Sequence, residues 1–228
     1  MSHLKRLAAP KTWPIKRKQS SFITRPSPGP HNLVSSMPID FILRELLEFA
    51  KTKREINKVL NERKILVNNT AIKEKNHPVG IFDTISIPAT GDYFRLLFSR
   101  LGKFILHKTT KTDAEIKYLR IKNKKILKGG KIQLNFSDGT NMVTEKKDYK
   151  VGDTLIVHGK ELMKHLKFEK GALIYLISGK HIGKTGTLHE VLSFKGSQQD
   201  RIVLKGKEGN IDTLKEYAFV IEKEFKDE

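Results

Sequence analysis

Residues 52–69, TKREINKVLNERKILVNN, decide how the first half of this 228-residue chain folds. Thr52 can accept a hydrogen bond from the first helical turn, while Glu55 reaches back to the residue that caps the helix. This capping pair predicts a short helix that starts after Thr52. The residues that follow predict a tight helix exit and then a strand over 65–67 that ends in an Asn-Asn turn.

Two basic side chains, Arg54 and Lys58, lie one turn apart on one face of the predicted helix, and the apolar side chains lie on the other. Like charges at this spacing repel each other by roughly 0.2–0.5 kcal/mol. Such a pair is better placed when it faces an anion, although charged helix faces are usually just solvated. The helix alone leaves both interpretations open.

The segment also resembles the small RNA-binding domain first described in ribosomal protein S-four and shared with pseudouridine synthases and a tyrosyl-transfer-RNA synthetase. The resemblance rests on the capped helix, the strand with its turn, and the later residues Pro78, Gly80 and Asp83. This module usually has glycine at the helix exit and after the strand, where the chain has Arg63 and Asn69. Because Asn tolerates left-handed backbone angles, Arg63 is the larger departure and leaves the exact helix exit open.

An earlier helix completes the expected domain. Asp40 follows Pro38 and can cap a helix. Apolar side chains then recur at helical spacing, at positions 42, 43, 46, 47 and 50. We expect this stripe to pack against the second helix, in a small two-helix/β RNA-binding domain over 38–90.

The composition favours a polyanion as partner. The chain has 44 Lys and Arg against 25 Asp and Glu, a formal net charge of +19 and a pI near 9.9. Such a surplus fits nucleic acid or an anionic membrane, but no amphipathic basic helix is long enough for a membrane. The surplus is +7 over 1–39, +2 over 40–90, +10 over 91–170 and 0 over 171–228.

The absence of cysteine excludes disulfides and thiolate metal sites, so nothing points to an oxidising compartment. The chain has no run of about 18 apolar residues, and its basic N-terminus lacks the apolar core of a secretory signal. We therefore expect a soluble, cytoplasmic protein.

The first 37 residues predict an extended basic arm. They contain seven Lys and Arg and no acid, and six of the eight prolines precede residue 39. No apolar periodicity is present, so the arm is expected to be disordered when alone. Trp13, between Lys11 and Lys16, either stacks on a base or packs the arm onto the rest of the protein.

Short alternating strands replace helical spacing beyond residue 90. They predict a β-rich central domain over 91–169, in which 94–98 and 103–107 form a hairpin. The other strands are expected at 116–121, 126, 132–136 and 154–157.

A strand, a Gly-rich loop and a second strand follow Gly171 and resemble the KOW motif. Gly183 and Gly186 suit a tight turn and a close approach of strands. The resemblance implies an SH3-like β-barrel over 170–221 with its loop tip on RNA. An acidic tail over 222–228 is expected to be solvated.

Motifs for catalysis and metal binding are weak. The loop 179–185 has three residues between its glycines, whereas a phosphate-binding P-loop needs four and a following helix. The eight histidines are scattered without the short spacing of zinc sites, and neither a nucleophile elbow nor a catalytic carboxylate pair stands out. We expect no enzyme, metal, cofactor or small-molecule substrate.

The arm motifs HLKRLAAP (3–10) and RPSPGPH (25–31), followed by these modules in this order, resemble the archaeal and eukaryotic small-subunit ribosomal protein S-four-e family. The resemblance implies an α+β, multi-domain, structural protein that binds small-subunit ribosomal RNA and neighbouring ribosomal proteins. The rivals are an RNA-modifying enzyme and a KOW-bearing transcription elongation factor. The expected RNA-binding residues are Lys5, Arg6, Lys11, Trp13, Lys16, Arg17, Lys18, Arg25, His31, Lys53, Arg54, Lys58, Arg63, Lys64, Lys180, His181 and Lys184.

Overall fold

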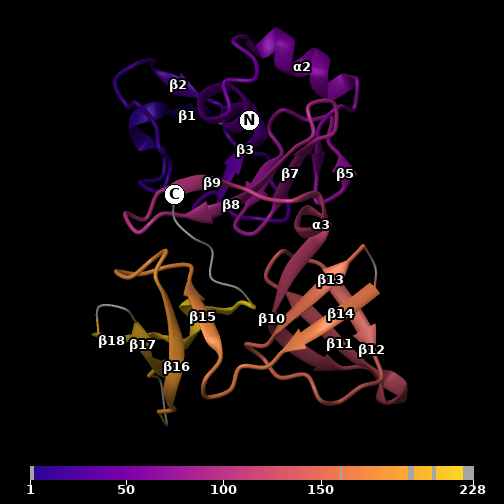
Figure 1. The fold of residues 1–228 in the computed structure, drawn as a ribbon, viewed down its shortest axis with the longest axis vertical. Coiled ribbons are helices and arrows are strands. Elements are labelled where there is room, and N and C mark those ends of the chain that lie inside the picture. The colour runs from indigo at the N-terminus through magenta and orange to yellow at the C-terminus, as the bar shows by residue number, and fades with distance from the viewer. Residues whose placement is uncertain (1–2, 160, 195–197, 207–208, 223–228) are drawn as a thin grey trace. The chain divides into compact units, whose positions relative to one another are not determined.

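The computed structural model describes residues 3–159, 161–194, 198–206 and 209–222. The chain divides into two compact units, one of residues 1–97 with 103–117 and one of residues 98–102 with 118–228. The described part is mostly β with few helices (Figure 1). The strand-rich second half of the predicted α+β fold is therefore confirmed, although the expected central domain and barrel fall into one unit.

Short strands join the N-terminal arm to the first unit. β1 (Leu4–Lys5) pairs antiparallel with β2 (Phe22–Ile23), and the 3-10 turn η1 (Arg6–Ala8) follows β1. β3 (Ser36–Pro38) pairs antiparallel with β6 (Pro78–Gly80). The arm is thus folded back on itself and paired with a later strand, and it is not extended as its composition predicts.

Trp13 packs the arm into the core of the first unit. The side chain is 1% exposed, and its indole Nε1 donates a hydrogen bond to the carbonyl oxygen of Ser36 at 2.9 Å. Its ring centroid lies 6.0 Å from that of Phe41. Of the two roles that the sequence allows, packing is therefore the one observed. The buried indole presents no face to a base, so the structure gives no support to the predicted RNA contact of Trp13.

Two short helical turns follow the arm and come before the first regular helix. α1 (Ile39–Phe41) continues into the π-helical turn η2 (Ile42–Leu46). Asp40 does not cap α1 as predicted but lies inside its first turn, fully buried. Its carboxylate accepts a hydrogen bond from the hydroxyl of Thr24 in the arm, and this long-range contact decides its position.

α2 (Lys53–Asn61) starts where the sequence predicts. The Thr52 hydroxyl accepts a hydrogen bond from the Glu55 N–H at 3.3 Å, and the Glu55 carboxylate accepts one from the Thr52 N–H at 3.3 Å, so the capping box is confirmed. The N–H of Lys51 also donates to this carboxylate at 2.9 Å. That bond, followed by those from Thr52, lowers the pKa of Glu55.

The first unit contains a five-stranded sheet in the order β5-β4-β7-β8-β9. Its strands are β4 (Leu66–Val67), β5 (Thr70–Ala71), β7 (Thr84–Ile87), β8 (Asp92–Phe98) and β9 (Phe104–Lys108). The predicted hairpin exists as β8 and β9, but β8 pairs with β7 and so extends this sheet past the predicted domain boundary at residue 90. The alternating pattern of a hairpin does not say which sheet the hairpin joins. The short helix α3 (Lys111–Ala114) follows β9.

The second unit contains two five-stranded sheets (Figure 1). The first has the order β12-β11-β10-β13-β14, with the 3-10 turn η3 (Lys128–Gly130) between β10 and β11. Its strands are β10 (Ile116–Ile126), β11 (Ile132–Phe136), β12 (Asn141–Thr144), β13 (Thr154–His158) and β14 (Glu161–Leu166). Ile121, Leu134 and Leu155 are fully buried in its core.

The second sheet of this unit has the order β18-β17-β16-β15-β19, with every neighbouring pair antiparallel. Its elements are β15 (Leu173–Leu176), β16 (Thr185–Leu192), β17 (Arg201–Gly206), β18 (Gly209–Leu214), η4 (Lys215–Tyr217) and β19 (Ala218–Val220). A Cβ on Gly183, where φ is +79°, would lie 2.3 Å from the Ser99 carbonyl oxygen, and one on Gly186 would lie 3.0 Å from that of Lys205. The predicted close approach at both glycines is confirmed.

The Gly-rich loop 179–185 leads into strand β16, whereas a P-loop leads into a helix. No helix of the described residues is long and apolar enough to span a membrane. Among the same residues, no three His, Asp or Glu side chains come together as a group that could bind a metal ion. The predicted acidic tail lies outside the described residues, apart from Glu222.

Candidate nucleic-acid interface

The exposed face of α2 is basic. Arg54 and Lys58 are exposed, whereas Ile56 and Leu60 are 1% and 0% exposed and pack into the core. Lys53, the first residue of the helix, is also exposed. The N-terminus of a helix is itself electropositive. Basic side chains in the first turn add to this positive charge, so together they attract a phosphate more strongly. This face combines the chemistry and the exposure that an RNA backbone requires.

The exit of α2, which the sequence leaves open, is a Schellman motif. The N–H of Lys64 donates to the Val59 carbonyl at 3.3 Å and that of Arg63 to the Leu60 carbonyl at 3.0 Å. Arg63 occupies the left-handed position of the motif, with φ +54°, which explains why the resembling module has glycine there. Arg63 is exposed, and exposed Lys64 forms an ion pair of 2.5 Å with Glu62.

A buried carboxylate joins the arm to the first unit. The Asp83 carboxylate accepts hydrogen bonds from the Asn68 side chain and the Gly80 N–H, both at 2.8 Å, and lies 2.9 Å from His31 Nε2. Burial raises the pKa of Asp83, but the hydrogen bond and charge of His31, with the bonds from Asn68 and Gly80, outweigh burial and leave the pKa below its usual value.

His31 therefore has a structural role inside the protein, and its contact with RNA stays a prediction. Its side chain is only 10% exposed. A Cβ on Gly80 would lie 2.3 Å from the His31 ring, so the imidazole packs directly on that glycine. Gly80 and Asp83 thus both lie against the imidazole of His31.

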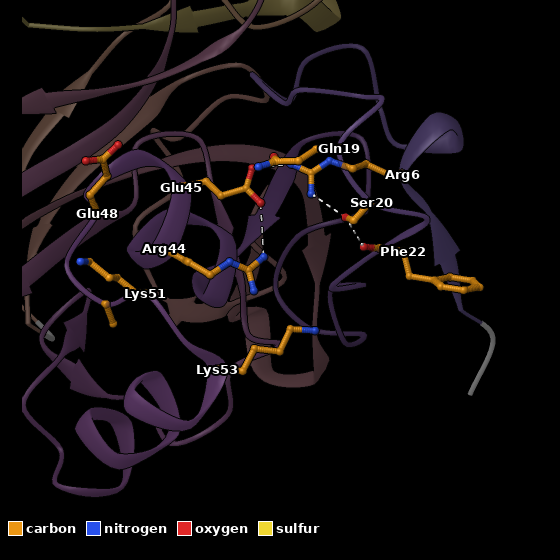
Figure 2. A pocket seen from close by; sticks show the side chains of 10 residues that line it. Arg6, Gln19, Ser20, Phe22, Arg44, Glu45, Glu48, Lys51 and Lys53 are labelled. Carbon is orange, nitrogen blue, oxygen red and sulfur yellow. Dashed lines mark hydrogen bonds and ion pairs between the residues drawn. The ribbon is translucent and has the colours of Figure 1, made fainter.

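Two arginines of the arm that are predicted RNA ligands also make contacts inside the protein. Arg6 is 3% exposed; its guanidinium donates to the Lys16 carbonyl at 2.7 Å and forms an ion pair of 2.6 Å with Glu45 (Figure 2). The half-buried Arg17 donates to three carbonyl oxygens, those of residues 7, 9 and 10, at 3.0–3.1 Å. A planar guanidinium with five donors suits such sites, and these contacts shape the arm itself.

The remaining predicted cations of the arm point away from the protein. All five are exposed: Lys5, Lys11, Lys16, Lys18 and Arg25. In the second unit, Lys180 is exposed in the loop between β15 and β16, whereas His181 and Lys184 are half-buried. The loop closes through a hydrogen bond of 2.8 Å from the Gly183 N–H to the Leu176 carbonyl.

A further basic surface, the β10–β11 hairpin, is not named by the sequence reasoning. Residues 116–137 contain seven Lys and Arg and no acid. Five of these lysines are exposed, among them Lys122, Lys125, Lys128 and Lys131. A fifth, Lys124, donates to two backbone carbonyls of the second unit at 2.8 Å each. The signal was available as the surplus of +10 over 91–170, but the charge count did not say which strands would expose it.

Comparisons with known proteins fit this arrangement. A model of the ribosomal family S4e matches residues 90–161, and one of the RS4NT domain matches residues 2–34, which include both arm motifs. The small ribosomal subunit protein eS4 of Methanocella arvoryzae is 41% identical over 225 residues, with 98% of this chain and 95% of the relative covered. The chain belongs to the ribosomal S4e family.

Other members of the S4e family are also similar over most of the chain. The small ribosomal subunit protein eS4 of Archaeoglobus fulgidus is 38% identical over 227 residues, which cover 99% of this chain and 95% of the relative. The crystal structure of the 30S ribosomal protein S4e from Thermoplasma acidophilum matches with a TM-score of 0.71 and 30% identity, over 82% of this chain and 95% of that chain. The resemblance expected from the arm motifs is thereby confirmed.

Proposed function

We propose that this S4e family member contributes no chemistry of its own to the ribosome and binds ribosomal RNA through its exposed lysines and arginines. As a family member it is a structural constituent of the small ribosomal subunit in the cytoplasm, where it associates with ribosomal RNA and ribosomal proteins. The similarity to eS4 over 98% of the chain carries this conclusion. The relatives give no support to an RNA-modifying enzyme or a transcription elongation factor.

The proposed interface consists of four basic surfaces. The arm contributes its exposed cations, the α2 face contributes the side chains around its two ends, the β10–β11 hairpin contributes four lysines, and the loop 177–184 contributes its tip. Each cation that neutralises a phosphate releases condensed counterions, so the affinity falls steeply with salt. The α2 face contains Lys53, Arg54, Lys58, Arg63 and Lys64, and the loop contains Lys180, His181 and Lys184.

We further propose the modular organisation that the sequence suggests, with one change of boundary. The capping box, the left-handed exit of α2 and the Asp83 cluster support an S-four-type RNA-binding module over 38–90 that β8 and β9 extend. The antiparallel sheet of β15–β19 with its two crowded glycines supports a KOW-type barrel over 170–221. In this proposal the modules position the protein on shaped RNA, and the exposed cations supply most of the affinity.

The double variant Arg54→Glu with Lys58→Glu tests the proposal. Both side chains are exposed on α2, whereas Ile56 and Leu60 form its buried face. We therefore expect the melting temperature to stay the same. Affinity for a transcript of the small-subunit ribosomal RNA should fall about 10-fold or more, since two attractive charges become repulsive. Equal binding of the variant would remove α2 from the interface. Absence of the full chain from purified small subunits would contradict the function as a whole.

A further inference from the structure

The arm exposes an aromatic side chain on its outer surface. Phe22 is 57% exposed, whereas its neighbour Ile23 is 6% exposed. Successive side chains of a strand point to opposite faces, so the burial of Ile23 in β2 directs Phe22 outward. The ring of His3 lies beside it, with the two centroids 5.5 Å apart and the planes at 58°.

Two clefts of the first unit are both lined in part by Phe22. One has a volume of about 720 Å³ and is lined by Phe22 with Arg44, Lys51 and Lys53 among others. The other has a volume of about 390 Å³ and is lined by Phe22 and Lys53 again. In the larger cleft, the Phe22 ring points away from the side chains of Arg44 and Glu45 (Figure 2). Phe22 and Lys53 are thus the residues that the two clefts share.

The clefts are cationic. The smaller one is lined by three basic side chains, Arg25, Lys53 and Lys75, and by no acid among the described residues. The acids of the larger one are Glu45 and Glu48, and Glu45 is already paired with Arg6 at 2.6 Å and with Arg44 at 3.3 Å. An exposed aromatic ring next to two cationic clefts suits a ligand that has flat apolar rings and a negatively charged backbone.

We propose that Phe22 is a stacking platform for an unpaired base of ribosomal RNA, with the flanking phosphates in the two clefts beside Lys53. The proposal rests on the RNA-binding function above and names its substrate as single-stranded RNA. Bases in loops and bulges stack on aromatic side chains, whereas bases in a duplex present no free face. A protein partner would have to bring carboxylates to these clefts, and the cationic lining favours phosphate.

Phe22 thus takes the role that the sequence offers to Trp13. Both are aromatic residues of the basic arm, Trp13 between Lys11 and Lys16 and Phe22 between Lys18 and Arg25. The structure separates them through burial, since Trp13 is 1% and Phe22 57% exposed. Stacking requires the exposed face that only Phe22 provides of these two.

Removal of the ring gives the first test. In the full chain, Phe22→Ala should weaken binding of a single-stranded ten-nucleotide oligoadenylate by about 5- to 100-fold and leave its salt dependence unchanged, because no charge is removed. Phe22→Tyr keeps the π-face and should bind as the wild type does. Leu7→Ala is the matched control, since Leu7 is 71% exposed in the same arm and should leave the affinity unaltered.

A fluorescent substitution gives the second test. Phe22→Trp should be quenched when oligoadenylate stacks on it, and a ten-base-pair RNA duplex at equal occupancy should not quench it. Trp13 is buried and its indole N–H is bonded to Ser36, so its emission supplies a constant background. Phe22→Ala measured with circular dichroism and thermal melting checks that the arm stays folded.

The outcomes separate this proposal from the broader function. If the wild type binds small-subunit ribosomal RNA but Phe22→Ala binds oligoadenylate equally well, or Phe22→Trp is not quenched, the stacking proposal is wrong and the function stands. If Phe22→Ala binds both RNAs normally yet fails to join small subunits, the ring contacts a protein and the proposal is again wrong. If the wild type binds neither RNA, both proposals fail together.

Discussion

The N-terminal arm and the β10–β11 hairpin are the two most purely cationic stretches of the chain, and they use their charge differently. Residues 1–39 and residues 116–137 each contain seven Lys and Arg and no acid. In the arm, two of the seven basic side chains, Arg6 and Arg17, form hydrogen bonds or ion pairs within the protein. In the hairpin, five lysines are exposed, and four of them have no contact described above, namely Lys122, Lys125, Lys128 and Lys131.

The difference depends more on whether the side chain is arginine or lysine than on the region in which it lies. Arg120 of the hairpin resembles Arg6, because it donates to the backbone carbonyls of Lys215 and Glu216 at 3.2 and 2.5 Å, and burial lowers its pKa. A guanidinium satisfies several acceptors at once and is less strongly hydrated than an ammonium. In both regions, arginine is used mainly within the structure, and most lysines remain at the surface for a partner.

The largest effect on stability should come from a substitution of Trp13, which packs the arm into the core of the first unit. Trp13→Ala removes a fully buried indole and should lower the free energy of unfolding by about 3–5 kcal/mol, as measured by denaturant titration. Limited proteolysis should then cleave the arm faster. An exposed arm residue, as in Lys11→Ala, is the control and should change neither. A normal melting temperature together with weakened RNA binding would show that Trp13 meets RNA after all.

The second prediction compares the contributions of the hairpin lysines and the arm lysines to RNA affinity. Replacement of Lys122, Lys125, Lys128 and Lys131 by Gln should reduce the affinity for small-subunit ribosomal RNA about 10- to 100-fold at low salt. It should also lower the salt slope by roughly 0.7–0.9 for each phosphate that is no longer neutralised. The matched arm variant replaces its four exposed lysines by Gln.

We expect a smaller decrease in affinity from that arm variant, in which Lys5, Lys11, Lys16 and Lys18 are changed. The hairpin lysines lie within ten positions of sequence, so their potentials add on one element. A larger decrease from the arm would reverse the ranking of the two regions. Neither variant should alter the melting temperature, because all eight side chains are exposed.

The Asp83 cluster, which joins the arm at His31 to the first unit, predicts a dependence on pH. Because the folded pKa of Asp83 lies below its unfolded value near 3.8, the unfolded chain binds the proton more readily. The stability from this carboxylate is complete above that value and is lost as the pH falls through the folded pKa. Asp83→Asn should cost about 1–2 kcal/mol at pH 7 and flatten the acid limb of the stability curve. An unchanged acid limb would contradict the assignment.

The sequence predicts local features of this protein better than distant ones. The capping box at Thr52 and the crowded glycines at 183 and 186 depend on neighbouring residues or on one backbone requirement, and both were predictable. The burial of Trp13 and the ion pair of Arg6 with Glu45 join residues that are far apart in sequence. Periodicity and charge contain no information about such pairs, so the sequence predicts an extended arm whose arginines contact RNA.

The smallest effect on stability should come from a substitution of Arg63, an exposed cation whose own backbone is in the strained left-handed conformation. A non-glycine residue at φ +54° costs about 1–2 kcal/mol, and glycine regains part of it at the expense of its own entropy. Arg63→Gly should therefore stabilise the protein by about 0.5–1 kcal/mol. Asn69→Gly at φ +62° is the control, since Asn tolerates this region and should gain less.

The same substitution tests why arginine is present at a position that favours glycine. If the guanidinium of Arg63 contacts RNA, Arg63→Gly should weaken the affinity for small-subunit ribosomal RNA about 3- to 10-fold while it raises stability. Arg63→Lys would then restore most of the affinity and none of the stability, because it keeps the charge and the strained backbone. A variant that is more stable and binds as well as the wild type would show that the strain at this helix exit serves no RNA contact. Lysine alone would then be the RNA-binding cation at this end of α2, as it is in the hairpin.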